Sequence, residues 1–510
     1  MGAGHNGLIA AAYLAKAGKK VAIFEAAPEV GGATASVRAF PEFDARLSRY
    51  SYLVSLLPDQ ICRDLNLQFE SISRDVSSYT PYFSSDKTSD KSSDKSGGLF
   101  VARQWDQRSS DSFAQLTGSD QEGAAWQNFY GQISKFAEKI APSMLGPLPT
   151  RSELKAEIGM DEIWDLLIET PIGAAIDRFF TDDVVKGVVL TDALIGTHTS
   201  AYDLAANRCF LYHLIGNGTG EWKVPRGGMG ALVNELVELC TSLGVEIYTN
   251  SRVISLMPSE SSVTVQIDSG EDFSADFLLS NAAPHVLAKL MSESIPPSLD
   301  GAQLKINMLV ERLPRLKSGA DPALAFAGTF HIAESFTQLE RAFKVSEQGE
   351  LPSPLPSEIY CHTLSDPSIL SKDLQERGFH TLTLFGLHVP AKLFDGDNDA
   401  MRQRAQAAAF AALNEYLVDP IESVIAKNSD GSLCVESKTP LDLEEAISLP
   451  RGNIFHRELA FPFREDGTAP SWGVETSHPR ILICGAGAIR GGGVSGIPGH
   501  NAAMAILQKD

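Results

Sequence analysis

The sequence has no pair of closely spaced cysteines. Its six cysteines are scattered, and no two of them form a C-x-x-C motif. They are Cys62, Cys209, Cys240, Cys361, Cys434 and Cys484. This spacing excludes the redox-active disulfide of thiol reductases and is typical of buried thiols in a reducing compartment.

Long apolar runs and positive charge are also scarce. No apolar run approaches the roughly 18 residues of a membrane-spanning helix, so we expect no integral membrane segment. The chain has 43 Lys and Arg against 64 Asp and Glu, which gives a net charge of −21. This charge argues against binding to nucleic acid and against electrostatic attraction to anionic lipid. Peripheral membrane contact and the oligomeric state stay open. No cleavable signal is visible, so we expect a cytoplasmic protein, or one of the mitochondrial matrix in a eukaryote.

Two further absences concern catalysis. No group of His, Cys, Asp and Glu residues has metal-ligand spacing, and no Ser-His-Asp order stands out. We therefore expect no metal, and the sequence names no catalytic residue. This is the situation in which a bound cofactor carries the chemistry while the protein supplies orientation and a dry pocket.

What the chain does have is a glycine-rich loop at its start, Gly2-Ala3-Gly4-His5-Asn6-Gly7. A helical pattern over 8–17, a turn at Gly18 and a strand over 21–25 follow it, and Glu25 lies 18 residues past Gly7. In a dinucleotide site the glycines let the backbone approach a pyrophosphate, the helix N-terminus faces its charge, and the acid holds a ribose hydroxyl. The order of these elements predicts a nucleotide site.

Two other glycine-rich stretches favour FAD over NAD. Gly31-Gly32 follows Glu25 by six residues, where a plain nicotinamide site has no need of a glycine pair. The second loop, over 485–493, is preceded by an expected strand at 481–484. A long cofactor needs such backbone donors near its flavin end, and the expected helix over 496–507 could stabilise an anionic reduced flavin with its N-terminus.

The region before the first glycine is short. A dinucleotide fold has a central strand that leads into this glycine, and only Met1 precedes Gly2. The loss of about five buried apolar residues, at roughly 1.5–3 kcal/mol each, would cost about a domain's net stability. We expect that the first β-strand is missing, because of a misplaced start codon or a truncation. The alternative is a natural variant in which another segment fills the place of this strand.

The rest of the chain alternates between two kinds of segment. A Ser-Asp-Lys repeat over 84–98 has no apolar residue and is expected to be a disordered insertion loop. Helical periodicity runs from 112 to about 180. We expect an α/β protein with a Rossmann-like FAD-binding domain of the glutathione-reductase type and an α+β substrate domain. The first comprises residues 1–75, 215–300 and 465–510, and the second residues 100–214 and 301–464.

Several motifs in this order resemble the phytoene-desaturase-like branch of the FAD-dependent, amine-oxidase-type flavoproteins. They are GAGHNGLIAAAYLAKAG from Gly2, SYLVSLLPDQI from Ser51, LTDALIG from Leu190, WKVPRGGMGAL from Trp222, GNIFH from Gly452 and GGGVSGIPGHNAA from Gly491. The likeness covers nearly the whole chain except the insertion. One departure is Ile489-Arg490, where such proteins usually carry His-Pro. Arg490 could stabilise flavin or phosphate charge or face solvent.

The resemblance implies FAD contacts for particular residues. Gly2, Ala3, Gly4, Asn6 and Gly7 would face the pyrophosphate, Glu25 the ribose, Gly32, Ala33 and Thr34 the FAD loop, Val253 the adenine, and Gly487, Gly493 and Val494 the flavin end. His456 and His500 are candidates for lining the flavin face.

The function that this implies is hydride transfer from a C–H bond of a hydrophobic or small organic substrate to FAD, with an unknown electron acceptor. The alternatives are a carotenoid desaturase or ketolase acting at a membrane surface, which would need an apolar tunnel, and a flavin-binding regulatory protein with little turnover.

Overall fold

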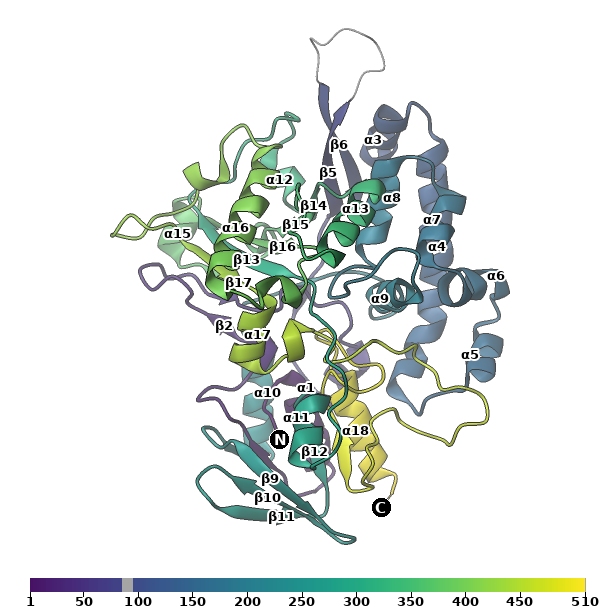
Figure 1. Ribbon diagram of the computed structural model, residues 1–510, viewed down its shortest axis with the longest axis vertical. Helices are drawn as coiled ribbons and strands as arrows, with labels where there is room; N and C mark the ends of the chain where they lie inside the picture. The colour runs from purple at the N-terminus through teal and green to yellow at the C-terminus, as the bar shows by residue number, and fades with distance from the viewer. Residues whose placement is uncertain (85–94, 510) are drawn as a thin grey trace.

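The computed structural model describes residues 1–84 and 95–509, which fold into three packed parts (Figure 1). Helices α3–α9 form one side, a mixed sheet with helices α12–α17 forms the other, and a cofactor part lies below both. In the cofactor part the purple start of the chain, teal middle segments and the yellow C-terminal helix come together. Within the described residues, no helix is long and apolar enough to cross a membrane.

The cofactor part is built on two pairs of parallel strands. The strands are β1 (Ala22–Phe24) beside β8 (Glu246–Tyr248), and β12 (Leu278–Ser280) beside β18 (Ile481–Ile483). Met1 and Gly2 lie between the pairs: the Met1 N-terminal ammonium donates to the Leu279 carbonyl at 3.0 Å, and the Gly2 amide to that of Phe24 at 2.8 Å. The packed helices are α1 (His5–Lys16), α2 (Asp59–Leu65), α10 (Gly230–Ser242), α11 (Pro284–Leu290) and α18 (Ile497–Leu507).

One hydrophobic core joins three stretches that are far apart in the sequence, residues 3–65, 229–245 and 474–506. Helix α1 buries every residue from His5 to Leu14, because α10 and α18 both pack against it. The approach of α18 is close, since a Cβ at Gly499 would lie 2.2 Å from the Asn6 carbonyl oxygen. An antiparallel meander completes this part, with strands β9 (Val253–Pro258), β10 (Val263–Ile267) and β11 (Asp272–Ala275).

The second part is a seven-stranded sheet in the order β17-β13-β16-β15-β14-β5-β6. All its pairings are antiparallel except β14 with β5. The strands are β5 (Val76–Ser84), β6 (Lys95–Ala102), β13 (Leu304–Val310), β14 (Thr329–Ile332), β15 (Ser357–Tyr360), β16 (His380–Gly386) and β17 (Val435–Lys438). The helices of this part are α12 (Pro322–Ala325), α13 (Phe336–Glu347), α14 (His362–Ser365), α15 (Lys372–Glu376), α16 (Asn398–Asn414) and α17 (Pro440–Ile447).

Two boundaries differ from the expectation. The insertion loop expected over 84–98 is shorter at both ends, because β5 and β6 pair as far as Ser84 and Lys95, and residues 85–94 lie outside the described residues. Phe40, Ala45 and Leu47, expected in the cofactor domain, pack into the core of the seven-stranded sheet. Short strands connect these parts: β2 (Ser36–Val37) with β3 (Leu47–Ser48), and β4 (Ser71–Ile72) with β7 (Val224–Pro225).

The third part is helical, as the periodicity predicts. Its helices are α3 (Gln107–Thr117), α4 (Gln121–Ile140), α5 (Arg151–Ile158), α6 (Asp161–Trp164), a π-helical turn (Asp165–Glu169), α7 (Ile172–Phe179), α8 (Asp183–Thr191) and α9 (Leu204–Ile215). Short 3₁₀ helices elsewhere are Gly32–Thr34, Ala141–Leu145, Pro367–Ile369, Ala391–Phe394, Ile421–Ser423 and Pro450–Gly452.

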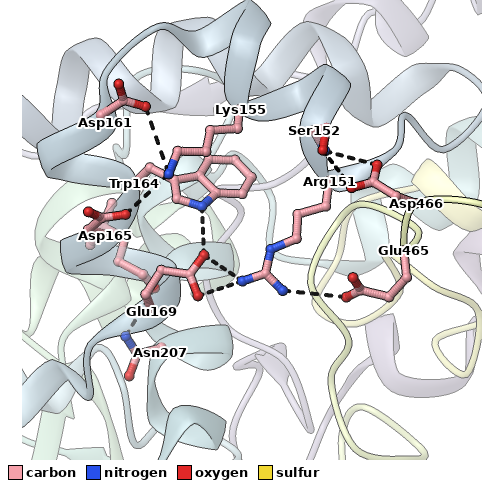
Figure 2. A network of polar contacts seen from close by, with 11 residues as sticks. Arg151, Ser152, Lys155, Asp161, Trp164, Asp165, Glu169, Asn207, Glu465 and Asp466 are labelled. Atoms are coloured by element: carbon pink, nitrogen blue, oxygen red, sulfur yellow. Dashed lines mark hydrogen bonds and ion pairs between the residues drawn. The ribbon is translucent and has the colours of Figure 1, made fainter.

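A polar network holds a late segment of the chain against this helical part (Figure 2). The Arg151 guanidinium lies between Glu169 and Glu465, 2.5 and 3.7 Å from their carboxylates. Ser152 donates to Asp466 at 2.5 Å through its hydroxyl. The segment that contains Glu465 and Asp466 precedes β18, so the network links α5 to the route into the C-terminal glycine loop.

Candidate cofactor and substrate site

A cavity of about 590 Å³ lies where the N-terminal glycine loop meets the C-terminal one. Most of the sequence-predicted cofactor residues line it: Gly2, Gly4, Asn6, Glu25, Gly32, Ala33, Val253, Gly493 and Val494. These residues come from the start, middle and end of the chain, so the fold gathers them into one elongated site.

The other four predicted residues, Ala3, Gly7, Thr34 and Gly487, are not among the residues that line the cavity. Ala3 is fully buried, and the Thr34 hydroxyl donates to the Gly31 carbonyl at 2.6 Å. Gly7 and Gly487 allow close packing instead, because a Cβ there would lie 2.3 Å from the Gly2 carbonyl oxygen and 2.4 Å from Pro284. These four residues shape the backbone behind the wall.

Glu25 follows β1 directly and fastens two loops by its carboxylate. One oxygen accepts a hydrogen bond from the Ala3 amide at 2.7 Å, and the other accepts from the Ala27 amide at 2.9 Å. The carboxylate is thereby held at the rim of the cavity, next to the turn of the glycine loop.

The cavity wall contains buried polar atoms without partners among the described residues, which is what a polar ligand would satisfy. They are Nε2 of His5, Oδ1 of Asn6, Nε2 of Gln303 and Nδ1 of His456. Burial lowers the pKa of both His5 and His456 to about 4, so both rings are neutral at pH 7. The N-terminus of α1, with its backbone amides and the glycine loop, fits the diphosphate of FAD.

Two expectations at the C-terminal loop need correction. Arg490 faces neither a ligand nor solvent: it is 1% exposed, and its guanidinium donates to the carbonyls of Ser143, Gly146 and Trp472. His500 is not among the cavity-lining residues. Its ring lies edge-on to that of Tyr13, and its Nδ1 is hydrogen-bonded to Oδ1 of Asn501. His456 does line the cavity, as predicted.

The segment over 49–56 supplies a stretch of cavity wall that the sequence does not predict, because its motif assigns no residue a role. Arg49 lines the cavity while its guanidinium pairs with Glu436, and the Tyr52 ring lies 4.7 Å from that of Tyr360. Asn281 also lines the cavity, which the sequence does not predict. Its side-chain amide packs closely on the glycine loop, because it would lie 2.9 Å from a Cβ at Gly4.

A second cavity, of about 500 Å³, lies between the seven-stranded sheet and the helical part. We call it the second chamber. It shares four wall residues with the cofactor cavity: Ile195, Trp222, Glu358 and Tyr360. Two of the four, Trp222 and Tyr360, are aromatic, and on the cofactor side the His213 ring stacks on Trp222 with ring centroids 5.0 Å apart.

Charged side chains line the second chamber deep inside the protein. Arg74 is 8% exposed, and its guanidinium donates to the Trp222 carbonyl at 3.2 Å and the Thr329 hydroxyl at 3.5 Å. Asp192, His331 and Glu358 also line the chamber. Burial of this many charges requires that they compensate one another or hold protons.

His331 is the centre of this charge cluster. Its Nδ1 lies 2.7 Å from a carboxylate oxygen of Glu334 and 3.9 Å from one of Glu358. Burial opposes a charge on the His331 ring, but Glu334, Glu358 and Asp192 together raise its pKa. Burial, together with Glu334, raises the pKa of Glu358 to about 8, and burial raises that of Asp192 to about 6.

A ring nitrogen of His331 and one carboxylate oxygen each of Glu334 and Glu358 lie within 4.8 Å of one another. The spacing of these residues in the sequence does not indicate this proximity. The 2.7 Å contact between His331 and Glu334 is that of a hydrogen-bonded ion pair. The ion pair of His331 and Glu334 carries no net charge, and Glu358 is neutral when it holds a proton. The positive charge of Arg74 then compensates the negative charge of Asp192.

Comparisons with known proteins agree with this geometry. The family model for flavin-containing amine oxidoreductases matches residues 59–344, more than half of the chain. This chain belongs to the flavin-containing amine oxidoreductases. A model for NAD(P)-binding Rossmann-like domains matches residues 1–59, which contain the first glycine loop and Glu25.

Relatives and solved structures extend the likeness of this flavin-containing amine oxidoreductase over its whole length. The protein Rv0897c of Mycobacterium tuberculosis is 42% identical over 99% of this chain and 96% of its own. Pyridine nucleotide-disulfide oxidoreductase domain-containing protein 2 of Mus musculus is 28% identical over 100% of this chain and 92% of its own. A solved structure of a putrescine oxidase variant shares the fold, with a TM-score of 0.57 and 18% identity over 100% of this chain and 98% of that one.

A phytoene desaturase of Pseudescherichia vulneris matches only 75 residues, 14% of this chain, at 44% identity. The family membership makes the chain an FAD-dependent oxidoreductase with a Rossmann-like dinucleotide-binding part.

Proposed function

We propose that this oxidoreductase takes a hydride from a C–H bond of a small organic substrate that binds in the second chamber. The observation that carries the proposal is the wall shared by the two cavities, Ile195, Trp222, Glu358 and Tyr360. A substrate in the second chamber would meet the end of the cofactor cavity at this wall.

FAD would lie extended along the cofactor cavity, in the manner of glutathione-reductase-type flavoproteins. The loop Gly2–Gly7 and the N-terminus of α1 would hold the diphosphate. Glu25 would accept from the adenosine ribose, the Val253 backbone would reach the adenine, and Gly493 and Val494 would reach the ribityl and flavin end. When bound, FAD supplies the acceptor for the hydride.

The chain's own residues would orient the substrate and exclude water. The rings of Tyr52, Tyr360 and Trp222 provide apolar surface at or beside the wall that the two cavities share. Arg74 and the carboxylates of Asp192 and Glu358 bring hydrogen-bonding groups to the chamber itself. Such an arrangement suits a small molecule with both an apolar portion and a polar group.

The charges in the second chamber disfavour the carotenoid alternative. A long hydrocarbon would place apolar surface against the charged groups Arg74 and Asp192 and keep water from them, which is costly. A flavin-binding regulatory protein, the other alternative, would carry FAD without being reduced by any substrate.

Anaerobic reduction of the purified, FAD-loaded protein tests the proposal. A panel of primary and secondary amines, alcohols and carotenoids in detergent micelles is mixed with the protein, and bleaching of the flavin absorbance is followed. We expect a polar amine or alcohol to bleach the flavin. Reduction by carotenoids alone would favour the desaturase, and no reduction by any compound would favour the regulatory protein.

A pair of variants on α4 tests whether the substrate binds in the second chamber. Ser134→Phe adds a ring to the second chamber, whereas Lys135→Phe adds the same ring on the exposed side of the helix. We expect Ser134→Phe to abolish reduction of the flavin by the substrate while it leaves the FAD content unchanged, and Lys135→Phe to affect neither. Equal reduction of the two variants would place the substrate elsewhere.

A further inference from the structure

We propose that Glu358 is a catalytic residue, which takes the proton from an N–H or O–H group on the same carbon that gives up the hydride. This inference rests on the proposed function, because it assumes that substrate binds in the second chamber. It narrows the substrate class to amines and alcohols.

The position of Glu358 carries the argument. It belongs to β15, is 2% exposed and lines both cavities, so its carboxylate lies where substrate and cofactor would meet. One oxygen accepts a hydrogen bond from the Tyr360 hydroxyl at 2.5 Å. The other oxygen is 3.9 Å from Nδ1 of His331, too far for a hydrogen bond, and remains for a substrate.

The groups around Glu358 keep it able to exchange a proton near neutral pH. They are Asp192 after α8, His331 in β14, Glu334 just beyond β14, and Tyr360, which is in β15 like Glu358. Arg74 faces Tyr360 and Asp192. Burial, with the negative charge of Glu334, raises the pKa of Glu358 to about 8. Its ionised form, which accepts the proton, therefore becomes the major form as the pH rises through about 8.

The step balances with FAD as the oxidant. The substrate C–H bond breaks, and its electron pair leaves with the hydrogen as hydride to the bound cofactor. The N–H or O–H bond breaks, its proton forms an O–H bond with the Glu358 carboxylate, and its electron pair becomes the second bond of C=N or C=O. A carboxylate can take a proton from such a group as the hydride leaves, but an unactivated C–H bond is far too weakly acidic for it.

A test that needs no substrate measures the protons taken up when the bound FAD is reduced. The midpoint potential is followed between about pH 7 and 9.5 by equilibration with a redox dye. Negative charge added to the cofactor opposes ionisation of a carboxyl beside it, so above about pH 8 the wild-type protein should take up more protons per two electrons than Glu358→Gln. Glu350→Gln, an exposed glutamate ahead of β15, is the control and should match the wild type.

Tyr360→Phe keeps the proposal testable if Glu358→Gln fails to fold. The Tyr360 hydroxyl donates to Glu358 and so stabilises its charged form, and its removal should move the onset of the extra proton uptake to higher pH. Coincident potential–pH curves for wild type and Glu358→Gln, or an unmoved onset in Tyr360→Phe, would overturn the proposal.

The pH profile of flavin reduction by a compound that reduces the wild-type protein is the second readout. We expect the rate constant to rise through about pH 8 and to fall by about a hundredfold to ten-thousandfold in Glu358→Gln. A wild-type rate in this variant would overturn the role of Glu358. If no compound reduces the wild type, the proposed function fails, while the proton-uptake comparison still decides whether Glu358 responds to the cofactor.

Discussion

Glu25 and Ala3 are joined by a 2.7 Å hydrogen bond in which the Ala3 amide donates to the Glu25 carboxylate. The bond ties the residue after β1 to the turn of the glycine loop. Glu25 can therefore serve FAD in two ways, as an acceptor for the ribose and as a brace for the loop that holds the diphosphate.

We predict that Glu25→Ala weakens FAD binding about tenfold to a hundredfold, because a hydrogen bond to a charged group contributes roughly 1.5–3 kcal/mol. Titration of the apoprotein with FAD, followed by flavin fluorescence, measures the change. Glu25→Gln keeps an acceptor for the Ala3 amide without the charge, and its loss should be smaller. Unchanged affinity in Glu25→Ala would show that the residue does not serve the cofactor.

FAD binding should be accompanied by proton uptake through His5. One ring nitrogen of His5 donates to the Gly493 carbonyl, and Nε2 has no partner among the described residues. A neutral ring that keeps its proton on the first nitrogen offers Nε2 only as an acceptor, which repels a phosphate oxygen. The diphosphate therefore favours the protonated ring, whose pKa it raises from the value of about 4 set by burial.

The sign of this pH dependence follows from the linkage. Because the complex holds the extra proton, FAD affinity is highest at low pH and falls by about tenfold per pH unit between pH 4 and the raised pKa of the bound state. Calorimetric titrations in two buffers of different ionisation enthalpy measure the protons directly. In His5→Gln the proton uptake should disappear; uptake that survives this change would assign it to another group.

Arg490 should stabilise the fold rather than bind a ligand. Its guanidinium donates to three backbone carbonyls at 2.6, 2.6 and 2.9 Å. We predict that Arg490→Met lowers the free energy of unfolding by about 3 kcal/mol or more, since it leaves buried acceptors without donors. Arg480→Met is the matched control, because Arg480 bonds two carbonyls at the exposed surface and should cost well under half as much in a denaturation experiment.

The hairpin of β5 and β6 should tolerate a shorter connection. Ser84 pairs with Lys95, so an Asn-Gly dipeptide in place of residues 85–94 would close it with a two-residue turn. Because loop-closure entropy changes slowly with length, we expect the same FAD content and a melting temperature within a few degrees. A deletion that extends through Ser96 should be harmful, since the Ser96 hydroxyl donates to the Lys317 carbonyl and β6 would lose its register.

Local patterns predicted the elements of the cofactor part well. The helix expected over 8–17 is α1 at His5–Lys16, and the strand expected over 21–25 is β1 at Ala22–Phe24. Fixed glycine spacing and short-range periodicity act within a few turns of chain, so they can be recognised without tertiary contacts. The same holds for the cavity-lining residues Gly2, Gly4 and Glu25.

The second chamber could not be predicted in this way. Arg74, Asp192, His331 and Glu358 come from four separate segments and meet only because β14 pairs with β5 and β15. No local pattern encodes that strand order. Burial of Arg490 was hidden for the same reason, because its carbonyl partners near residues 143–146 are almost 350 residues away.

The core shared by residues 3–65 and 474–506 also has a consequence for synthesis of the protein. Helix α1 leaves the ribosome well before α18, which packs against it, because the two helices stand far apart in the sequence. Until then one apolar face of α1 has no partner, and the cavity lacks Gly493 and Val494. Cofactor loading therefore follows synthesis of α18, and messages cut short before α18 should yield flavin-free protein that depends on chaperones.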